Sequence, residues 1–383
     1  MPHFFDWFPG NSRSTQDSTS RPRLPPMDEG RTSLRLAILG LLTQLILAAQ
    51  YASSAELYVN NEIGIDSCNG LSPVVTDQKT GPTRTIRRAL ELAKPADVVH
   101  VAPGSGPYFE SLSLVGSRHS GVESLPFTIE ARGATISGAR RVPPDAWVEI
   151  APGTWRFIPV RKGFAQLFLN QQRVPERVQT VDPNSKDIPL LQEHEWCYWK
   201  GSILYQQRSG YNSTPSRLPL EFAYDSCGIT LVDVEHVLII GLHVERFRQD
   251  GINVHDRARN ILLQDVELRD NGRAGLVTAG TSLVGARNTR ISGNRLTQVL
   301  GLEKSWLELL DCKLDSDIGE RTRSEGGTLL ELTGTGKSDA GATPAGETQN
   351  ATPAAGNSSP REEPESPASE NGETPSPSPD ANQ

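Results

Sequence analysis

A glycine-led repeat is the feature that most constrains how this chain can fold. Five short strand-like segments open on glycine at spacings of 23, 24, 26 and 26 residues, and they begin at Gly228, Gly251, Gly275, Gly301 and Gly327. A second apolar unit recurs between them, at 235–245, 259–269 and 287–297. A fixed period in this range indicates one supersecondary unit stacked on copies of itself. Each unit has a strand, turn, strand, turn pattern without helical periodicity, so the sequence predicts a parallel β-helix.

Alternation within the repeats predicts which side chains stack. At the offsets of 23 and 24 residues, Ile229, Ile252 and Leu276 fall in one column and point into the core. On the outer face, the same offsets place residues of opposite charge over one another: Glu245 over Arg269, Arg246 over Asp270 and His243 over Glu267. Such exposed pairs set the register more than they add stability.

The third coil departs from this pattern. Asn294 falls at the core position that Val266 occupies one coil earlier, and Lys304 falls at that of Thr278. A buried amide or ammonium group needs a polar partner. We therefore expect the register to slip in this coil.

The amino-terminal segment has the pattern of an export signal. An uncharged apolar run at 36–49 follows two arginines and precedes the small residues Ser53 and Ala55, which predicts cleavage before Glu56 and a secreted or extracytoplasmic protein. The run is shorter than the roughly 20 residues that span a bilayer. A membrane anchor through 36–49 is the alternative. Translation from Met27 would give a signal of ordinary length.

The carboxyl-terminal segment has the composition of a disordered tail. From Gly334 to Gln383 it lacks Ile, Leu, Val, Met, Phe, Tyr and Trp, and Pro, Ser and Glu are frequent. Such a segment cannot bury enough apolar surface to fold alone. It carries two basic and eight acidic residues, and so holds most of the chain's net charge of −8. The remainder is close to neutral, which gives a nucleic-acid partner no electrostatic support.

The four cysteines are Cys68, Cys197, Cys227 and Cys312, and their spacings fit no zinc motif. An even number in an exported chain permits two disulfides. Of the pairings, Cys197–Cys227 is the one expected, and Cys312 is interpreted as a buried small apolar residue because it lies in phase with neighbouring leucines.

An amphipathic helix is predicted ahead of the coils. Ile86, Leu90 and Ala93 mark one face and Pro95 ends it, so it can cover the open end of the stack. The expected organisation is a leader and signal at 1–55, the cap helix and first coils at 56–139, an inserted β subdomain at 140–224, regular coils at 225–333 and the tail at 334–383. The insertion breaks the period and is rich in Trp, Arg and Pro.

These segments resemble a known group of proteins. The opening motifs are Tyr58-Val-Asn, Asn69-Gly70-Leu-Ser-Pro73, Gly81-Pro82 and the alternating run from Asp97 to Gly104. They are similar to the start of bacterial exported right-handed parallel β-helix proteins with the pectate-lyase-like (pectin lyase) fold. The stretches 166–177 and 196–205 resemble an inserted sheet of glycosidase-like members. The resemblance implies an all-β, right-handed, single-stranded solenoid, and many such proteins process polysaccharides.

The stretch 250–256 contains the candidate catalytic residues, Asp250, His255 and Asp256. It resembles the catalytic stretch of mannuronan C5-epimerases, whose motif is Tyr-Gly-Phe-Asp-Pro-His. Gly251 and His255 match, but Asp250 replaces the tyrosine, Asn253 the first aspartate and Ala279 a later one. Three of the four reactive positions are lost, so epimerase chemistry is not expected. The alternative is a structural role, in which the histidine lies at the end of a strand and the aspartates form turns.

A charged cluster contains the candidate substrate-binding residues, which are His243, Arg246, Glu267 and Arg269. Guanidinium groups can hold an anionic sugar through paired hydrogen bonds. The alternative is an ordinary solvated charged face.

Two functions remain open at this level. The first is an exported protein that binds or acts on polysaccharide, as a lyase or a glycoside hydrolase if it is an enzyme. A uronate lyase would need Ca²⁺ or basic groups to neutralise the substrate carboxylate, whereas a hydrolase would need clustered carboxylates. No metal site is predicted from the sequence motifs. The second function is a non-catalytic surface scaffold.

Overall fold

The computed structural model describes residues 54–176, 187–208 and 214–333. Within them the chain is nearly all β, with one α-helix, and two 3₁₀ turns, η2 (Pro144–Ala146) and η3 (Pro215–Arg217). The apolar run at 36–49, Met27 and the acidic tail lie outside the described residues. The right-handed parallel β-helix with a capping helix and a β insertion, predicted above, is confirmed.

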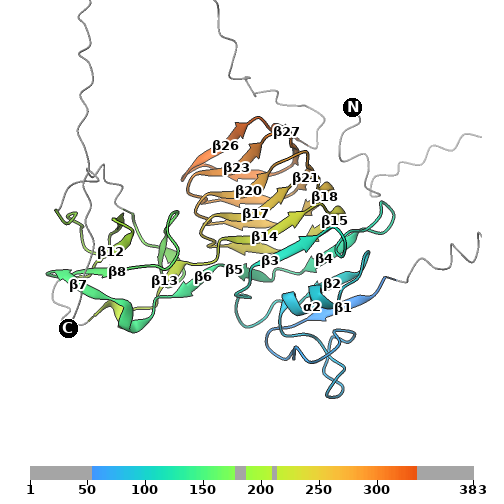
Figure 1. Ribbon diagram of the computed structural model, residues 1–383, viewed down its shortest axis with the longest axis horizontal. Coiled ribbons are helices and arrows are strands. Elements are labelled where there is room, and N and C mark those ends of the chain that lie inside the picture. Colours follow the sequence, from blue (N-terminus) through green and yellow to red (C-terminus); the bar gives the residue numbers. More distant parts are fainter. Residues whose placement is uncertain (1–53, 177–186, 209–213, 334–383) are drawn as a thin grey trace, which may run out of the picture. The chain divides into compact units, whose positions relative to one another are not determined.

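Three parallel sheets form the walls of the coil stack (Figure 1). Sheet A has the order β1 (Glu56–Val59), β2 (Val98–Val101), β4 (Phe127–Ala131), β15 (Glu235–Ile240), β18 (Arg259–Gln264), β21 (Leu283–Arg287), β24 (Trp306–Leu310) and β27 (Thr328–Leu332). Sheet B has the order β5 (Thr135–Ser137), β16 (His243–Glu245), β19 (Glu267–Arg269), β22 (Arg290–Ser292) and β25 (Lys313–Asp315). Sheet C has the order β3 (Leu112–Val115), β14 (Cys227–Val232), β17 (Asp250–His255), β20 (Ala274–Thr278), β23 (Thr297–Leu302) and β26 (Glu320–Glu325).

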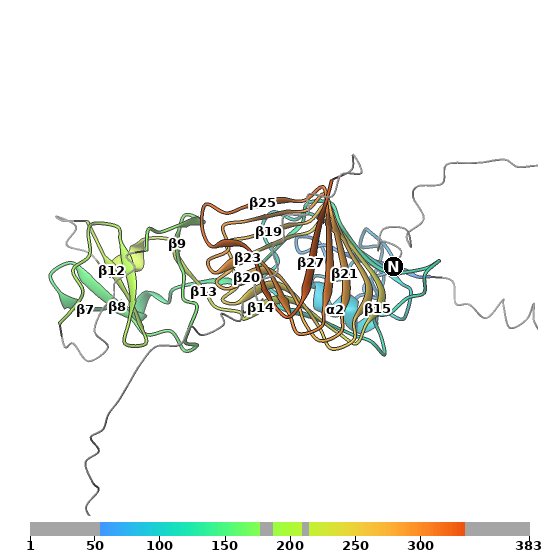
Figure 2. The same cartoon turned by 90° about the horizontal axis from the view of Figure 1, so that it is seen from above.

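Each regular coil therefore has three strands rather than the two expected. The second recurring unit contains two of them, because a turn at Gly241 and Leu242 separates β15 from β16. Figure 2, seen from above, shows the strands of each sheet lying over one another. From β4 onward the chain passes from sheet A to B to C in each coil, whereas the first rungs lack a strand in sheet B.

The predicted core columns are confirmed. Ile229 pairs in register with Ile252, and Ile252 with Leu276, and all three side chains are fully buried. In sheet A, Val237 lies over Ile261 and contributes to the same core. A single apolar core thus runs through all the coils, because every second side chain of each strand points inward.

The recurring glycines lie where successive coils approach closely. A Cβ atom on Gly228 would stand 2.5 Å from the carbonyl oxygen of Gly251, and one on Gly251 would stand 2.7 Å from that of Gly275. Close backbone approach therefore requires glycine at these positions. Gly301 and Gly327 do not continue this column. Gly301 pairs with Thr278 near the end of β23, and Gly327 precedes β27 in sheet A.

The third coil shows no register slip: β21 and β22 pair in continuous register with β18 and β19, with Ile261 over Val284 and Leu268 over Ile291. The expected positions of Asn294 and Lys304 are wrong, because Thr278 pairs with Gly301 and Asn294 lies beyond β22, where it has the partners that it needs. Its side-chain oxygen accepts hydrogen bonds from the backbone and side-chain amides of Asn271 at 3.0 and 2.9 Å. Its side-chain nitrogen donates to Gln298 and to the Leu268 carbonyl. Asn294 lies in the turn between β22 of sheet B and β23 of sheet C, away from the apolar core. The strands of this coil therefore keep their alternation of inward and outward side chains.

Helix α2 (Ile86–Leu92) forms as predicted and buries Ile86, Ala89 and Leu90. The Thr85 side chain caps it by accepting a hydrogen bond from Arg88. Glu110, which leads into β3, accepts hydrogen bonds at 2.9 Å from the first two helical amides. The helix residues belong to the main core, so α2 covers the first rungs.

The insertion replaces the connection from sheet B to sheet C in the first coil. Its two antiparallel sheets contain β6 (Ala139–Arg141), β9 (Leu167–Leu169), β10 (Gln172–Arg173) and β13 (Leu220–Ala223), and β7 (Val148–Ala151), β8 (Thr154–Phe157), β11 (Trp196–Trp199) and β12 (Ser202–Gln206). A separate core that includes Trp147, Phe157, Trp196 and Tyr205 holds them together. The aromatic residues of the insertion therefore mainly form its own core.

The expected Cys197–Cys227 bridge is wrong. None of the four cysteines, all of which lie in the described part of the chain, forms a disulfide. Cys227 opens β14 beside Asp250, whereas Cys197 lies in β11 and pairs across to Leu204. Cys312 is partly buried and packs against the main core, as interpreted from its phase.

Candidate functional site

A groove lies where the insertion meets the turns that lead from sheet B to sheet C. Its volume is about 750 Å³. The insertion contributes Phe164, Arg173, Val174, Pro175 and Glu176, and the coil turns contribute Gly272, Arg295, Leu296 and Ile318. We call this feature the junction groove.

The insertion side of the groove is anchored by a buried tryptophan. The indole nitrogen of Trp196 donates to the Val174 carbonyl at 3.0 Å, and its backbone amide donates to the Pro175 carbonyl at 3.1 Å. Trp196 is 1% exposed. The short segment after β10 is thereby fixed to the core of the insertion, which aims Glu176 at the coils.

The coil side approaches so closely that a turn must be glycine. A Cβ atom on Gly272 would stand 2.2 Å from the Arg248 carbonyl oxygen and 2.8 Å from that of Phe164. Gln166 completes the contact, because its side-chain nitrogen donates to the Asp270 carbonyl at 3.0 Å. Phe164 has a positive φ of 48°, which is unusual for an aromatic residue. Such a backbone conformation persists where the surrounding contacts hold it in place.

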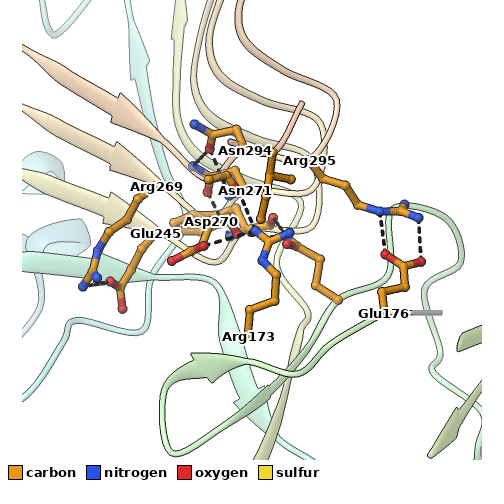
Figure 3. Close-up of polar contacts among 12 residues, drawn as sticks. Arg173, Glu176, Glu245, Arg269, Asp270, Asn271, Asn294 and Arg295 are labelled. Carbon is orange, nitrogen blue, oxygen red and sulfur yellow. Dashed lines mark hydrogen bonds and ion pairs between the residues drawn. The ribbon is translucent and has the colours of Figure 1, made fainter. Parts of the chain in front are cut away.

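Two arginine–carboxylate pairs cross the junction in opposite directions (Figure 3). Arg173 of the insertion pairs with Asp270 of the coil at 3.1 Å and also donates to the Gly293 carbonyl at 2.5 Å. Arg295 of the coil makes a bidentate pair with Glu176 of the insertion, at 2.9 and 2.6 Å. The exchange locks the two surfaces in one register and lines the groove with oriented polar groups.

Beneath these pairs lies the buried amide network of Asn271, Asn294 and Gln298. Asn271 accepts a hydrogen bond from the Phe247 backbone amide at 3.0 Å and donates to Asn294. All three amide side chains are 0% exposed. The network gives the turns a fixed shape, so that Asp270 and Arg295 project from a rigid base.

Glu176 has the perturbed carboxyl group of the groove. Burial raises its pKa, and the nearby Arg295 and Arg173 oppose that rise. Its side chain is 16% exposed, against 34% for Arg295. A carboxyl group with a raised pKa that still reaches a groove is suited to hydrogen bonding or proton transfer.

The candidate catalytic residues lie apart from this groove, on sheet C. Asp250 is 2% exposed and accepts a bidentate pair from Arg273, at 2.7 and 2.5 Å, and a hydrogen bond from Asn253. His255 pairs in register with Val232 and alternates with buried Val254, and its Nδ1 lies 3.3 Å from the Asp256 carboxylate. The structure thus brings His255 and Asp256 together and leaves Asp250 within an ion pair.

The candidate substrate-binding residues divide into two groups. Arg269 and Glu245 pair at 2.5 Å as the stacking predicted, and His243 lies 3.8 Å from Glu267. Arg246, however, is 2% exposed. The predicted pairing of Arg246 with Asp270 is wrong, since other groups engage both side chains.

Arg246 instead belongs to a balanced network between coil and insertion. Its guanidinium contacts Glu221 of β13 at 2.7 Å, contacts Glu245, and lies 5.7 Å from the centre of the Phe168 ring. The insertion supplies two of these three partners. The sequence repeat does not reveal them, because the repeat describes only the coils.

The residues that line the groove were not singled out from the sequence. Arg173 and Glu176 lie in the stretch 166–177, whose sequence signal is its resemblance to an inserted sheet. Arg295 lies in a recurring unit that was interpreted as core and turn. Arg295 and Glu176 are 119 residues apart in the sequence, and an ion pair at that separation has no local sequence pattern. The resemblance of 166–177 to an inserted sheet was the one sequence signal in this region.

No three His, Cys, Asp or Glu side chains in the described ranges gather where they could hold a metal ion. The Ca²⁺ requirement of a lyase therefore stays a prediction. No helix in the described part of the chain has both the length and the apolar character needed to span a membrane.

Comparison with known proteins gives structural likenesses only. No protein-family model and no curated protein matches the sequence. Among solved structures, the chain is similar to "The complex structure of XylC with xylose", at 12% identity and a TM-score of 0.39, covering 73% of this chain and 69% of that one. It is also similar to a Family 28 exopolygalacturonase of Yersinia enterocolitica, at 15% identity and a TM-score of 0.33, covering 74% of this chain and 60% of that one.

A third similar structure is the tailspike protein gp49 of Pseudomonas phage LKA1, at 13% identity and a TM-score of 0.23, covering 64% of this chain and 49% of that one. Superposition at these TM-scores is too loose to transfer a residue role. The fold assignment rests on the strand pairing itself: three parallel sheets with stacked coils make the chain a parallel β-helix protein.

Proposed function

We propose that the protein binds a polysaccharide in the junction groove. The observation that carries this proposal is the lining of the groove, where apolar surface alternates with oriented charged groups. The apolar part of the lining comes from Phe164, Val174, Pro175, Leu296 and Ile318. Sugar rings present C–H faces to such surface and hydroxyl groups to polar side chains, so this combination suits them.

The polar groups of the groove are balanced in charge. The charged residues of the lining are Arg173, Arg295 and Glu176. Arg295 pairs with Glu176 within the lining, and Arg173 pairs with Asp270 beside it, so each cation has a carboxylate partner. A balanced set favours hydroxyl groups, which can donate to a carboxylate and accept from a guanidinium group. The groove is therefore proposed to hold the uncharged part of a sugar chain.

Binding of the full-length protein to neutral and acidic polysaccharides, by titration calorimetry with and without Ca²⁺, tests the proposal. We expect the double variant Glu176→Gln/Arg295→Gln to lose about tenfold in affinity, because the amides keep the shape and remove the charged hydrogen bonds. The matched control is Asp233→Asn/Arg257→Gln, which removes an exposed ion pair elsewhere on the coils. Equal affinity in the groove variant and the control would refute the assignment.

Cleavage of the bound chain is the finer proposal, with Glu176 as the proton donor. The raised pKa of Glu176 is the direction that a general acid needs. Reducing ends without ultraviolet absorbance would indicate hydrolysis, and reducing ends with absorbance would indicate a lyase. Loss of either product in Glu176→Gln, with binding retained, would support the assignment.

A non-catalytic scaffold is the second candidate. It is favoured by the occupation of the carboxylates on the coil faces: Asp250 by Arg273, and Glu245 by Arg246 and Arg269. A hydrolase needs carboxyl groups free to exchange protons. Binding without any product from the whole panel of polysaccharides would favour the scaffold.

Export is proposed from the leader, with cleavage before Glu56. The Ala55 amide donates to buried Asp97 at 2.8 Å, and its carbonyl accepts from Val98 at 2.9 Å. Cleavage at the predicted site would remove both hydrogen bonds from the edge of sheet A. The amino-terminal sequence of the secreted protein would show whether the mature chain begins at Glu56, and an intact 36–49 segment in a membrane fraction would support the anchor instead.

A further inference from the structure

A cationic site, distinct from the charge-balanced groove, lies along the same junction one coil earlier. Three arginines converge there: Arg140 from β6, Arg161 from the loop after β8, and Arg248 from the turn that leads into β17. We call them the arginine cluster. Neither the repeat nor the groove accounts for them.

The cluster has more positive charge than its neighbours balance. Asp225 pairs with Arg140 at 2.6 Å and lies 4.0 Å from Arg161. Arg248 meets neutral oxygens instead, donating to the Lys162 carbonyl and to the Ser226 hydroxyl, each at 2.8 Å. Among the described ion pairs, Asp225 is thus the one carboxylate for Arg140 and Arg161, and Arg248 has none.

The guanidinium groups repel one another at this site. Burial and then the nearby Arg161 lower the pKa of Arg248. The Arg248 Nε atom is buried and has no hydrogen-bond partner among the described residues. An anion between Arg161 and Arg248 would relieve the repulsion between the two guanidinium groups.

An aromatic base orients the exposed member of the cluster. The Arg161 guanidinium lies 4.9 Å from the centre of the Tyr224 ring, and Arg140 lies 5.9 Å from the same ring. Arg161 remains 46% exposed. The cation–π contact holds the guanidinium group beside the ring, and its exposure leaves N–H groups accessible to an oxyanion.

The Arg246 network provides the contrast within the same junction. Arg246 has two carboxylate partners, Glu221 and Glu245, and is buried, so its charge is neutralised by the protein. Arg161 is exposed, stacked and near only a shared carboxylate. The first arrangement fastens two surfaces together, whereas the second leaves cationic charge for a ligand.

We propose that the arginine cluster binds an oxyanion, namely a carboxylate or sulfate substituent of a glycan, between Arg161 and Arg248. Ser226 can donate its hydroxyl proton to the same anion, since its oxygen already accepts from Arg248. The site is separate from the junction groove and does not depend on what the groove holds.

The test is titration calorimetry of the full-length protein with sodium sulfate and with sodium glucuronate, in chloride buffers of equal ionic strength. We expect saturable binding of at least one anion, and a loss of about tenfold in affinity in Arg161→Gln, because a bidentate charged contact disappears. Preference for glucuronate would identify a carboxylate site, and preference for sulfate would identify a sulfate site. Absence of saturable binding by both anions would overturn the proposal.

Matched variants separate this site from general charge and from the groove. Arg257→Gln removes one exposed cation elsewhere, from a side chain that is 76% exposed, and should leave anion binding unchanged. The groove variant Glu176→Gln/Arg295→Gln should also keep it. If Arg257→Gln weakened binding as much as Arg161→Gln, the effect would be one of net charge and the proposal would fail. Near-ultraviolet circular dichroism of Arg161→Gln verifies that the variant is folded.

Discussion

The coil stack is held together by apolar contacts, whereas its junction with the insertion is held together by polar and charged ones. The stack repeats apolar columns such as Ile229, Ile252 and Leu276, each fully buried. The junction instead uses ion pairs and amides, such as Arg295 with Glu176. Apolar burial is strong and non-directional, so it stabilises the coils. Charged hydrogen bonds are directional and fix geometry, so they suit a surface that must present groups to a ligand.

The largest effect should come from the apolar columns. Leu231→Ala removes a fully buried side chain from the main core and should cost about 2–5 kcal/mol of unfolding free energy. The matched control is Leu283→Ala, because Leu283 is 36% exposed and should cost only about 0.5 kcal/mol. Denaturant unfolding followed by far-ultraviolet circular dichroism measures both. Similar losses in the two variants would contradict the column model of the stack.

The amide network should come next. Asn294→Ala leaves the Asn271 amides and the Gln298 side chain without their buried partner, and should cost about 1–3 kcal/mol. The same unfolding measurement applies, with Gln172→Ala in β10 as the exposed amide control. A loss no greater than that of the control would mean that water replaces Asn294 without cost, and that the turns are not rigid.

A smaller and more local effect is expected at the junction. Arg295→Gln breaks the bidentate pair with partly buried Glu176 and should cost about 1 kcal/mol in the docking of the insertion, with the stack unaffected. Hydrogen exchange should rise in β9 and β10 and stay unchanged in β17 and β18. Faster exchange throughout the coils would show that the two regions unfold as one unit.

The smallest effect is a pH dependence near the cap. Burial lowers the pKa of His119 below its ordinary value of 6.5. Its Nδ1 accepts from the Val115 amide and its Nε2 lies 3.0 Å from the Leu90 carbonyl, which together fit the neutral ring. Below about pH 6.5 the unfolded chain binds more protons than the folded chain, so stability falls as the pH falls toward the folded pKa.

His119→Gln should flatten this part of the pH profile, as measured by thermal unfolding between pH 7 and pH 5. The matched control is His255→Gln, because His255 is on the exposed outer face of sheet C. An unchanged slope in His119→Gln would assign the pH dependence to other groups.

The sequence was sufficient for the coils up to the third one. The core columns, the Glu245–Arg269 pair and the cap helix follow from local periodicity, which repeats in every coil. The glycine spacing is misleading beyond Gly275, because Gly301 lies near the end of β23 and Gly327 precedes β27 in sheet A, so neither continues the column of the first three glycines. Arg246 was misplaced for a related reason: its partners come from the insertion, which the repeat does not describe.

The sequence by itself determined the periodic solenoid, because successive residues of a strand point to opposite faces and their polarity shows which face is buried. What only the tertiary structure decided is the junction. Arg173 meets Asp270 across 97 residues, and Arg295 meets Glu176 across 119. The same holds for the arginine cluster around Asp225. Contacts at such separations depend on how the insertion packs against the turns, and no local pattern of apolar and polar residues encodes that packing.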